Sequence, residues 1–147
     1  MPIIFKFECS HCGFALPTGW GGYLYVENNN GERITCGHPS EKHDVIKVLG
    51  KDPPSDLVKQ RVGYNYCCVC LDCLHKFDAD FHHHYFVYVI NPLGGSIRND
   101  GLKTEKDKRE CPKCKSKNIG TINEMVGKTC PKCEKGIMGK IDTGCIS

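Results

Sequence analysis

The stretch YNYCCVCLDCLHKF, residues 64–77, places four cysteines within seven positions and limits how the chain can bind a metal ion. Cys67 and Cys70 form one C-x-x-C pair, and Cys70 and Cys73 form a second pair that overlaps the first. A single ion can use only one of these pairs as adjacent ligands. The choice between them decides how the other cysteines of the chain are grouped.

The composition indicates a small protein that needs a metal or disulfide staple. The chain has 147 residues, 39% hydrophobic content, 16 Gly and 8 Pro, so neither half can bury much apolar surface. It also has 12 Cys and 7 His. The first residues, MPIIFKFECS, lack an export-signal pattern, and no apolar run reaches the roughly 18 residues of a membrane span. We therefore expect a cytoplasmic protein without membrane contact, whose grouped thiols bind zinc.

C-x-x-C pairs recur along the chain as CSHC at 9–12, CLDC at 70–73, CPKC at 111–114 and CPKC at 130–133. Two intervening residues allow a tight turn, here called a knuckle, to point both sulfurs at one ion. Segment 94–110, between the second and third knuckles, is rich in Gly and charge, which indicates a linker or loop. The sequence thus predicts an N-terminal module over 1–93 and a C-terminal module over 111–147.

The last two knuckles form C-x2-C-x15-C-x2-C, a spacing typical of zinc sites. We predict that one zinc ion is bound by Cys111, Cys114, Cys130 and Cys133, with KSKNIGTINEMVGK between them folded as a β-hairpin. Segment 109–136 resembles a zinc ribbon. Two redox C-x-x-C pairs are less consistent with the sequence, because such a pair comes singly within a βαβ context.

The first two knuckles are predicted to bind a second zinc ion through Cys9, Cys12, Cys70 and Cys73. Gly13 follows the first knuckle and suits the positive φ of such turns. In zinc-ribbon-like proteins an aromatic residue often follows the second knuckle, and Phe77 meets this pattern only if Cys70 and Cys73 form the pair. The 57 residues between these knuckles exceed the length of a hairpin, so we expect an insertion.

The insertion is predicted to contain a hairpin and two helices. GGYLYV (21–26) and RITC (33–36) flank the polar turn ENNNGER (27–33). SEKHDVIKVLG (40–50) has an apolar helical face with Ser40 as a candidate N-cap, and SDLVKQRVG (55–63) has Ser55 in the same position. Beyond the second knuckle, FHHHYFVYVI (81–90) is aromatic and β-branched and predicts a strand.

The cysteines and histidines outside these sites leave alternatives open. Cys36 and His38, together with Cys67 or Cys68, would make a third zinc site. Alternatively, Cys36 and Cys68 are buried thiols that pack as small apolar side chains. Cys145 is expected to be an ordinary thiol.

Two other features are open in the same way. His82 and His84 share one face of the predicted strand, opposite His83, and could bind a metal or form a polar face. Trp20, in the glycine-rich loop LPTGWGGY (16–23), could cover a knuckle or be an exposed contact.

The arrangement resembles small zinc-ribbon proteins of prokaryotes with rubredoxin-like knuckles, in which a TGWGGY-like loop follows the first C-x-x-C and a CLDC-like knuckle comes later. The resemblance concerns architecture and implies no activity. We expect a small metal-stabilised β-rich (α+β) fold, with an N-terminal zinc ribbon that carries a helical insertion and a C-terminal zinc ribbon. Two zinc ions per chain are expected, or three if the third site forms.

Four thiolates close the coordination shell of zinc, whereas catalytic zinc keeps a position open for water. The sequence also lacks H-E-x-x-H, deaminase and nucleophile-elbow motifs. We therefore expect a non-catalytic adaptor that binds another protein, with metal or redox handling as a less favoured alternative. A nucleic-acid-binding alternative rests on residues 98–147, which carry 12 basic and 7 acidic side chains. The lysines concerned are Lys113, Lys115, Lys117, Lys128, Lys132 and Lys135.

Overall fold

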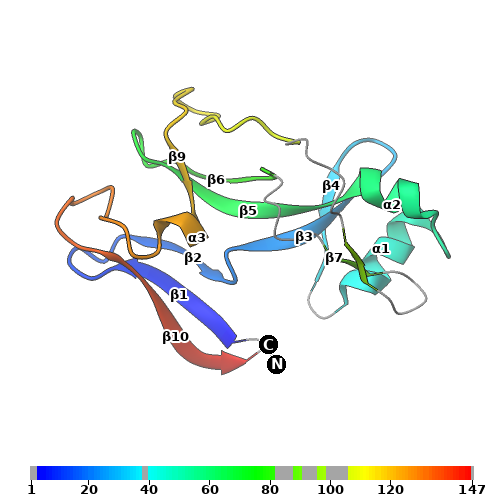
Figure 1. Ribbon diagram of the computed structural model, residues 1–147, viewed down its shortest axis with the longest axis horizontal. Helices are drawn as coiled ribbons and strands as arrows, with labels where there is room; N and C mark the ends of the chain where they lie inside the picture. The colour runs from blue at the N-terminus through cyan, green and yellow to red at the C-terminus, as the bar shows by residue number, and fades with distance from the viewer. Residues whose placement is uncertain (1–2, 38–39, 82–87, 91–95, 99–105, 147) are drawn as a thin grey trace. The chain divides into compact units, whose positions relative to one another are not determined.

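The computed structural model describes residues 3–37, 40–81, 88–90, 96–98 and 106–146 (Figure 1). The chain divides into two compact units. Unit 1 comprises Met1–Gly22, Tyr66–Ala79 and Asp107–Ser147, and unit 2 comprises Tyr23–Asn65 and Asp80–Lys106. Unit 1 thus combines segments from both ends of the chain with one from its middle. The compact units therefore do not follow the expected sequential division into 1–93 and 111–147.

Unit 1 contains a three-stranded assembly here called repeat A. It consists of β1 (Ile3–Cys9), β2 (Ala15–Gly19) and β10 (Met138–Ile146), in the order β10-β1-β2 with antiparallel pairing throughout. The first knuckle joins β1 to β2, and the fourth knuckle precedes β10. The first and last strands of the chain are therefore neighbours in one sheet.

A second assembly in unit 1, here called repeat B, has the same plan. The C-terminal part of β5 (Val62–Cys70) pairs antiparallel with both β6 (Lys76–Ala79) and β9 (Ile119–Thr121). The second knuckle joins β5 to β6, and the third knuckle precedes β9. After β9 the chain enters the short helix α3 (Ile122–Met125).

The two repeats agree in strand register. Cys9 pairs with Met138 in repeat A, and Cys70 pairs with Ile119 in repeat B. The next pairs, Glu8 with Gly139 and Val69 with Gly120, also correspond. Repeat B lies between the two halves of repeat A in the sequence, so the repeats are nested rather than consecutive.

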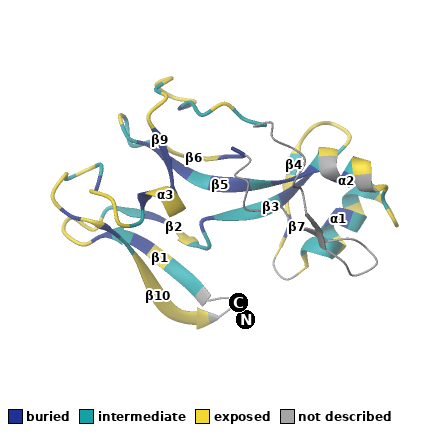
Figure 2. Cartoon of the chain, in the orientation of Figure 1, coloured by how far each residue is buried: buried dark blue, intermediate teal, exposed yellow. Residues whose placement is uncertain are grey.

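The core of unit 1 draws on both repeats and includes two of the knuckle cysteines. Its buried members are Phe7, Cys9, Leu16, Val69, Ile122, Met125, Cys130 and Met138. Figure 2 shows these buried stretches on β1, β5 and α3. A core of this size contributes little hydrophobic stabilisation, which is the condition under which small domains depend on a metal or disulfide.

Unit 2 contains the expected hairpin and two helices. Its sheet order is β4 (Arg33–Thr35), β3 (Gly22–Glu27) and the N-terminal part of β5. The helices are α1 (Glu41–Leu49) and α2 (Ser55–Arg61). Val26, Val45, Val58 and Val62 form its core with Cys36. These elements confirm the prediction for residues 21–61.

Some local predictions for unit 2 differ from the structure. Ser40 makes no side-chain cap to α1; instead its Oγ donates to the carbonyl of Gly37 at 3.0 Å, and Asp44 Oδ2 accepts from Gly37 N–H at 2.7 Å. Pro54, not Ser55, occupies the N-cap of α2.

Part of the expected linker forms β8 (Ser96–Arg98), which pairs with β7 (Tyr88–Ile90). The rest of the predicted strand, 82–87, lies outside the described residues.

A buried polar pair stabilises unit 2. The Tyr25 hydroxyl donates to Asp80 Oδ2 at 2.7 Å, and the backbone N–H of Tyr64 donates to the same oxygen at 3.3 Å. Burial raises the pKa of Tyr25, and the Asp80 carboxylate adds to this shift. Gly63 leaves the necessary space, because a Cβ there would lie 2.3 Å from both Asp80 Oδ2 and the Tyr25 hydroxyl.

None of the helices in the described part of the chain has the length and apolarity needed to span a bilayer.

Candidate metal centres

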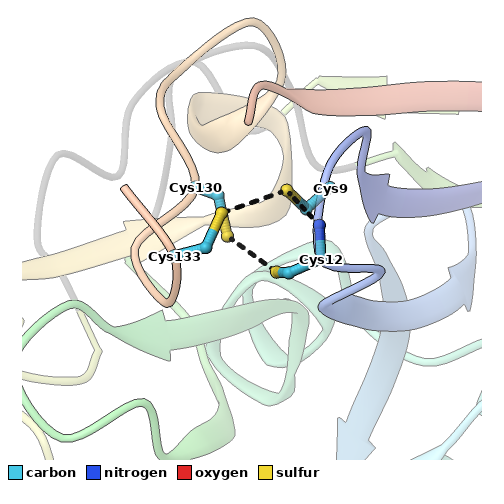
Figure 3. A group of neighbouring side chains, drawn as sticks. All are labelled: Cys9, Cys12, Cys130 and Cys133. Carbon is cyan, nitrogen blue, oxygen red and sulfur yellow. Dashed lines mark hydrogen bonds between the residues drawn. The ribbon is translucent and has the colours of Figure 1, made fainter. Parts of the chain in front are cut away.

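The structure gathers eight cysteines into two groups of four, within each of which the sulfurs lie within 4.8 Å of one another. Site A consists of Cys9, Cys12, Cys130 and Cys133, and site B consists of Cys70, Cys73, Cys111 and Cys114. Figure 3 shows site A, where two knuckles from distant parts of the sequence turn their sulfurs toward each other. The same eight cysteines are the ligands expected from the sequence, but the expected pairing of knuckles is wrong.

The sulfur–sulfur distances fit a tetrahedral ion in both sites. Cys9 Sγ lies 3.6 Å from Cys133 Sγ, and Cys12 Sγ lies 3.7 Å from Cys130 Sγ. In site B the corresponding distances are 3.5 Å for Cys70–Cys114 and 3.6 Å for Cys73–Cys111. A zinc–sulfur bond of about 2.3 Å in a tetrahedron requires sulfurs about 3.8 Å apart. The two sites therefore have nearly the same geometry and the size of a metal tetrathiolate.

Backbone N–H groups of the knuckles point at the sulfurs. In site A, His11 N–H and Cys12 N–H donate to Cys9 Sγ at 3.3 and 3.4 Å. In site B, Lys113 N–H and Cys114 N–H donate to Cys111 Sγ, both at 3.4 Å. Such donors stabilise a thiolate, which is the form that binds a metal.

The pKa values of the thiols reflect this competition between burial and hydrogen bonding. Burial opposes ionisation of Cys111, but the backbone N–H groups of Cys114 and Lys113, together with hydrogen bonds from the Cys73 and Cys114 thiols, outweigh it and lower its pKa to about 7. The backbone N–H groups of Gly136 and Lys135 lower the pKa of Cys133 to about 6. Four thiolates at these distances repel one another strongly, so all four ionise together only around a cation.

All four knuckles end with a residue in the left-handed conformation. Its φ is 74° at Gly13, 64° at Leu74, 66° at Lys115 and 59° at Glu134. In the last three knuckles this residue donates its N–H to the carbonyl of the first cysteine, at 2.9 to 3.0 Å. The sequence indicated this conformation only at Gly13, because the other three positions carry side chains that disfavour it.

Lys115→Gly is expected to stabilise unit 1 by about 1 kcal/mol, since glycine removes the cost of a left-handed φ and loses only part of that gain to chain entropy. Thermal unfolding of the metal-loaded protein measures the effect. Lys113→Gly is the matched control in the same knuckle, because Lys113 is not among the residues with positive φ. That control should destabilise the protein. Equal responses of the two variants would contradict the assignment of strain to position 115.

The knuckle pairing differs from the expectation because segment 115–129 does not form a hairpin. Its strand β9 pairs with β5, which brings the third knuckle to the second. The chain then turns into α3 through a capping box: Thr121 Oγ1 accepts from Glu124 N–H at 3.2 Å, and Glu124 Oε1 accepts from Thr121 N–H at 2.9 Å. The motif T-x-x-E at 121–124 was the sequence signal for this helix.

The cysteines proposed for a third site join no ligand group among the described residues. Cys36 is buried in the core of unit 2, and burial raises its pKa to about 12. Cys68 is buried in unit 1 and donates its thiol to the Tyr66 carbonyl at 3.3 Å, with burial raising its pKa to about 12. Both thus match the alternative of packed, un-ionised thiols. Cys67 packs against the core of unit 1.

Of the other candidate residues, the structure describes Trp20 and Cys145. His38 and the triplet His82, His83 and His84 lie outside the described residues. Trp20 is half-buried, and Cys145 is exposed.

Unit 1 also contains an open cleft of about 500 Å³ that the sequence did not reveal. Its apolar lining includes Leu71, Ile119 and Met125, and Pro131 of the fourth knuckle borders it. The charged lining residues are Arg109, Glu124, Lys128 and Glu134. Arg109 pairs with the Glu124 carboxylate and donates to the Ile119 carbonyl at 2.8 Å. The cleft was not predictable because it depends on how the two repeats assemble.

The lysines of the nucleic-acid alternative are exposed in both repeats. Lys113, Lys115 and Lys117 follow one another along the third knuckle, whereas Lys128, Lys132 and Lys135 surround the fourth. Unit 1 carries 11 Lys and Arg and 8 Asp and Glu side chains, a net charge of +3. Each zinc tetrathiolate adds −2 because zinc contributes +2 and the thiolates −4, so two centres would bring the unit from +3 to −1.

Comparison of the chain with protein-family models, with curated proteins and with solved structures gives no match in any of the three.

Proposed function

We propose that this chain is a non-catalytic protein-interaction module held in shape by two nested zinc ribbons. The observation that carries the proposal is the composition of sites A and B, each of which has four cysteine sulfurs at tetrahedral spacing. A zinc ion with four thiolate ligands has no position left for water or substrate. Its contribution is then structural: each ion joins two knuckles that are far apart in the sequence.

Zinc is the ion that these donors favour. Thiolate ligands are soft and select zinc over calcium, magnesium or manganese, and a closed tetrahedral S₄ set is typical of structural zinc. Two ions per chain would be bound, one in each repeat. The small apolar core of unit 1 gives those ions a large share of the folding free energy.

The cleft of unit 1 is the surface on which we place the protein partner. Protein interfaces combine an apolar centre with a polar rim. The cleft has this composition, with Leu71, Ile119 and Met125 in its lining beside the exposed rim residues Lys128 and Glu134. A rim with both signs of charge suits a polypeptide better than a uniformly anionic partner.

Nucleic-acid binding is the second candidate, and one observation favours it. Lys113, Lys115 and Lys117 lie in a five-residue stretch that begins inside the third knuckle, and all three side chains are exposed. Phosphate contacts require such exposed cations. Against this, the net charge of unit 1 falls to −1 when two zinc tetrathiolates are counted with its 11 basic and 8 acidic side chains.

Two double charge reversals separate these functions. Lys128→Glu with Glu134→Lys alters the rim of the cleft, and Lys113→Glu with Lys115→Glu alters the third knuckle away from it. Chemical crosslinking in cell extract, with and without nuclease, identifies proteins that the wild-type chain retains. Retention on a nucleic-acid column at several salt concentrations measures the alternative.

An adaptor is expected to lose its crosslinked protein in the rim variant, keep it in the knuckle variant and be indifferent to nuclease. A nucleic-acid binder is expected to show the reverse, with column retention that falls steeply with salt and is lost in the knuckle variant. Zinc content of two per chain in both variants shows that the fold is intact. Loss of the same protein in both variants would count against the cleft as the binding surface.

A further inference from the structure

The outer edge of β10 carries backbone groups that face away from its own sheet. Ser10 N–H donates to the Ile137 carbonyl at 3.1 Å, so Ile137, Gly139 and Ile141 direct their backbone groups toward β1. Met138, Lys140 and Asp142 therefore direct theirs outward. Met138 is satisfied there, since its N–H donates to the Lys128 carbonyl at 2.9 Å and its carbonyl accepts from Gly127 N–H at 2.8 Å.

Beyond Met138 the outer edge is open in the described part of the chain. No hydrogen bond involves the N–H or carbonyl of Lys140 or of Asp142 on this side among the described residues. The strand is also exposed from Lys140 to Cys145, as Figure 2 shows along β10. An unpaired strand edge of this kind is a template for pairing with another chain.

In repeat B, the backbone groups at the position equivalent to Lys140 are bonded within the chain and are not available to another strand. Thr121 of β9 corresponds to Lys140 of β10, because Thr121 pairs with Cys68 as Lys140 pairs with Phe7. At Thr121 the outward N–H is bonded by the Glu124 carboxylate, and the chain leaves the strand to form α3. The previous outward-facing carbonyl of β9, that of Ile119, accepts a hydrogen bond from the Arg109 guanidinium. At Lys140, β10 has neither a carboxylate of the described residues bonded to the outward N–H nor a turn into a helix, and it continues as a strand to Ile146.

We propose that β10 pairs antiparallel with β10 of a second copy of this chain, with Ile141 on the two-fold axis. Only residues with outward backbone groups can face each other as hydrogen-bonded pairs. Three registers satisfy this rule: Lys140 opposite Lys140, Asp142 opposite Asp142, or Lys140 opposite the partner's Asp142. The third register alone sets opposite charges against each other, and it does so twice because the interface is two-fold.

The same register buries an exposed apolar side chain. Ile141 is 44% exposed, and it would lie opposite the partner's Ile141 as a non-hydrogen-bonded pair, where side chains approach most closely. In the single chain the Lys140 ammonium lies 4.1 Å from the centre of the Phe5 ring, so it leaves the edge clear, and in the dimer it would turn from the ring to the partner's Asp142. The two copies would then join into one sheet, β2-β1-β10 continued through the strands of the partner.

The paired segment is short, so the dimer depends on protein concentration. The contacts of Gly127 and Lys128 close the edge at Met138. At the other end Gly144 has φ 76° and donates to Asp142 Oδ1 at 2.7 Å, and the register with β1 shifts before pairing resumes at Ile146, so the regular strand geometry is interrupted there. This self-association is separate from the cleft and does not depend on the proposed adaptor function.

Charge exchange tests the register. Lys140→Glu places a second carboxylate opposite the partner's Asp142, and Asp142→Lys sets two lysines against each other, so each variant should weaken dimerisation about tenfold or more. Mixing the two variants restores both attractive pairs and should give a heterodimer, as should the double variant with itself. Sedimentation velocity of the zinc-loaded protein under reducing conditions measures each dissociation constant. Lys47→Glu, on the exposed side of α1, is the charge control and should have no effect.

A covalent trap gives an independent readout. In a Cys145→Ser background, Ile141→Cys is expected to form an intermolecular disulfide on mild oxidation, because non-hydrogen-bonded pairs bring Cα atoms within disulfide range. Thr18→Cys, at an exposed position of β2, is the control and should remain monomeric. A protein that stays monomeric at millimolar concentration would overturn the proposal. So would a dimer that the single charge reversals leave unchanged or that mixing fails to restore.

Discussion

Removal of both metal ions is expected to unfold unit 1 completely. Structural zinc in small domains contributes on the order of 10 kcal/mol per site, which is comparable with the whole stability of a typical domain. The core of unit 1 cannot replace this contribution, because two of its eight buried members, Cys9 and Cys130, belong to candidate site A itself. A strong chelator should therefore abolish the cooperative thermal transition of this unit.

Hydrogen exchange shows which strands unfold when the metal ions are removed. Amides of β1, β9 and β10, which pair within the two repeats, should lose protection when metal is removed and regain it when zinc is added. Addition of magnesium instead of zinc serves as the control and should restore nothing, since thiolate ligands do not select that ion. A metal-free protein that keeps protected strands and a sharp transition would contradict the structural role of the ions.

Gly136→Ala is expected to eliminate the metal of site A while leaving site B loaded. A Cβ at this position would lie 2.3 Å from Cys9 Sγ, 2.8 Å from His11 Cβ and 2.9 Å from the backbone nitrogen of His11. The clash is with a ligand and with backbone, so neither can move aside without displacing the first knuckle. Overpacking alone costs roughly 1–3 kcal/mol, and loss of the ion adds to it. Zinc content should fall from two to one per chain.

Gly139→Ala provides the matched control. It lies three residues further along the same segment, and its added Cβ would meet only the Glu8 carbonyl at 3.6 Å, an ordinary contact. This variant should keep both ions and nearly the full stability. A Gly136→Ala protein that bound two ions with wild-type affinity would contradict the close approach of position 136 to Cys9 in site A.

The knuckles themselves were predictable from the sequence, because C-x-x-C is a local geometric requirement. Phe77 pointed to Cys70 and Cys73 rather than Cys67 and Cys70 as the second knuckle, and these two cysteines do lie in site B. The helices and hairpin of residues 21–61 also followed from local signals, namely apolar periodicity and a polar turn. These features depend on neighbours in the sequence, which a single sequence can display.

The pairing of knuckles depends on contacts between distant strands, and the spacing alone could not determine it. Fifteen residues between Cys114 and Cys130 suit a hairpin, but they also suit a strand followed by a capped helix. The structure takes the second solution because Thr121 and Glu124 cap α3 and β9 pairs with β5. Fragment 115–129 therefore links two repeats instead of closing one.

The nested order explains the other discrepancies. Site A joins Cys9 to Cys133, so the ends of the chain belong to one sheet, and a sequential division into halves separates partners. The cleft and the open edge of β10 also depend on this arrangement, since both involve residues of the fourth knuckle or the strand that follows it. The central claim of the structure is thus the pairing of the first knuckle with the fourth and of the second with the third.

Cadmium-113 NMR of the cadmium-substituted protein tests that pairing most directly, because each cadmium signal correlates with the β-protons of its own cysteine ligands. We expect one signal connected to Cys9, Cys12, Cys130 and Cys133, and a second connected to Cys70, Cys73, Cys111 and Cys114. A signal that connects Cys111 and Cys114 with Cys130 and Cys133 would contradict the nested arrangement and return the chain to two consecutive ribbons.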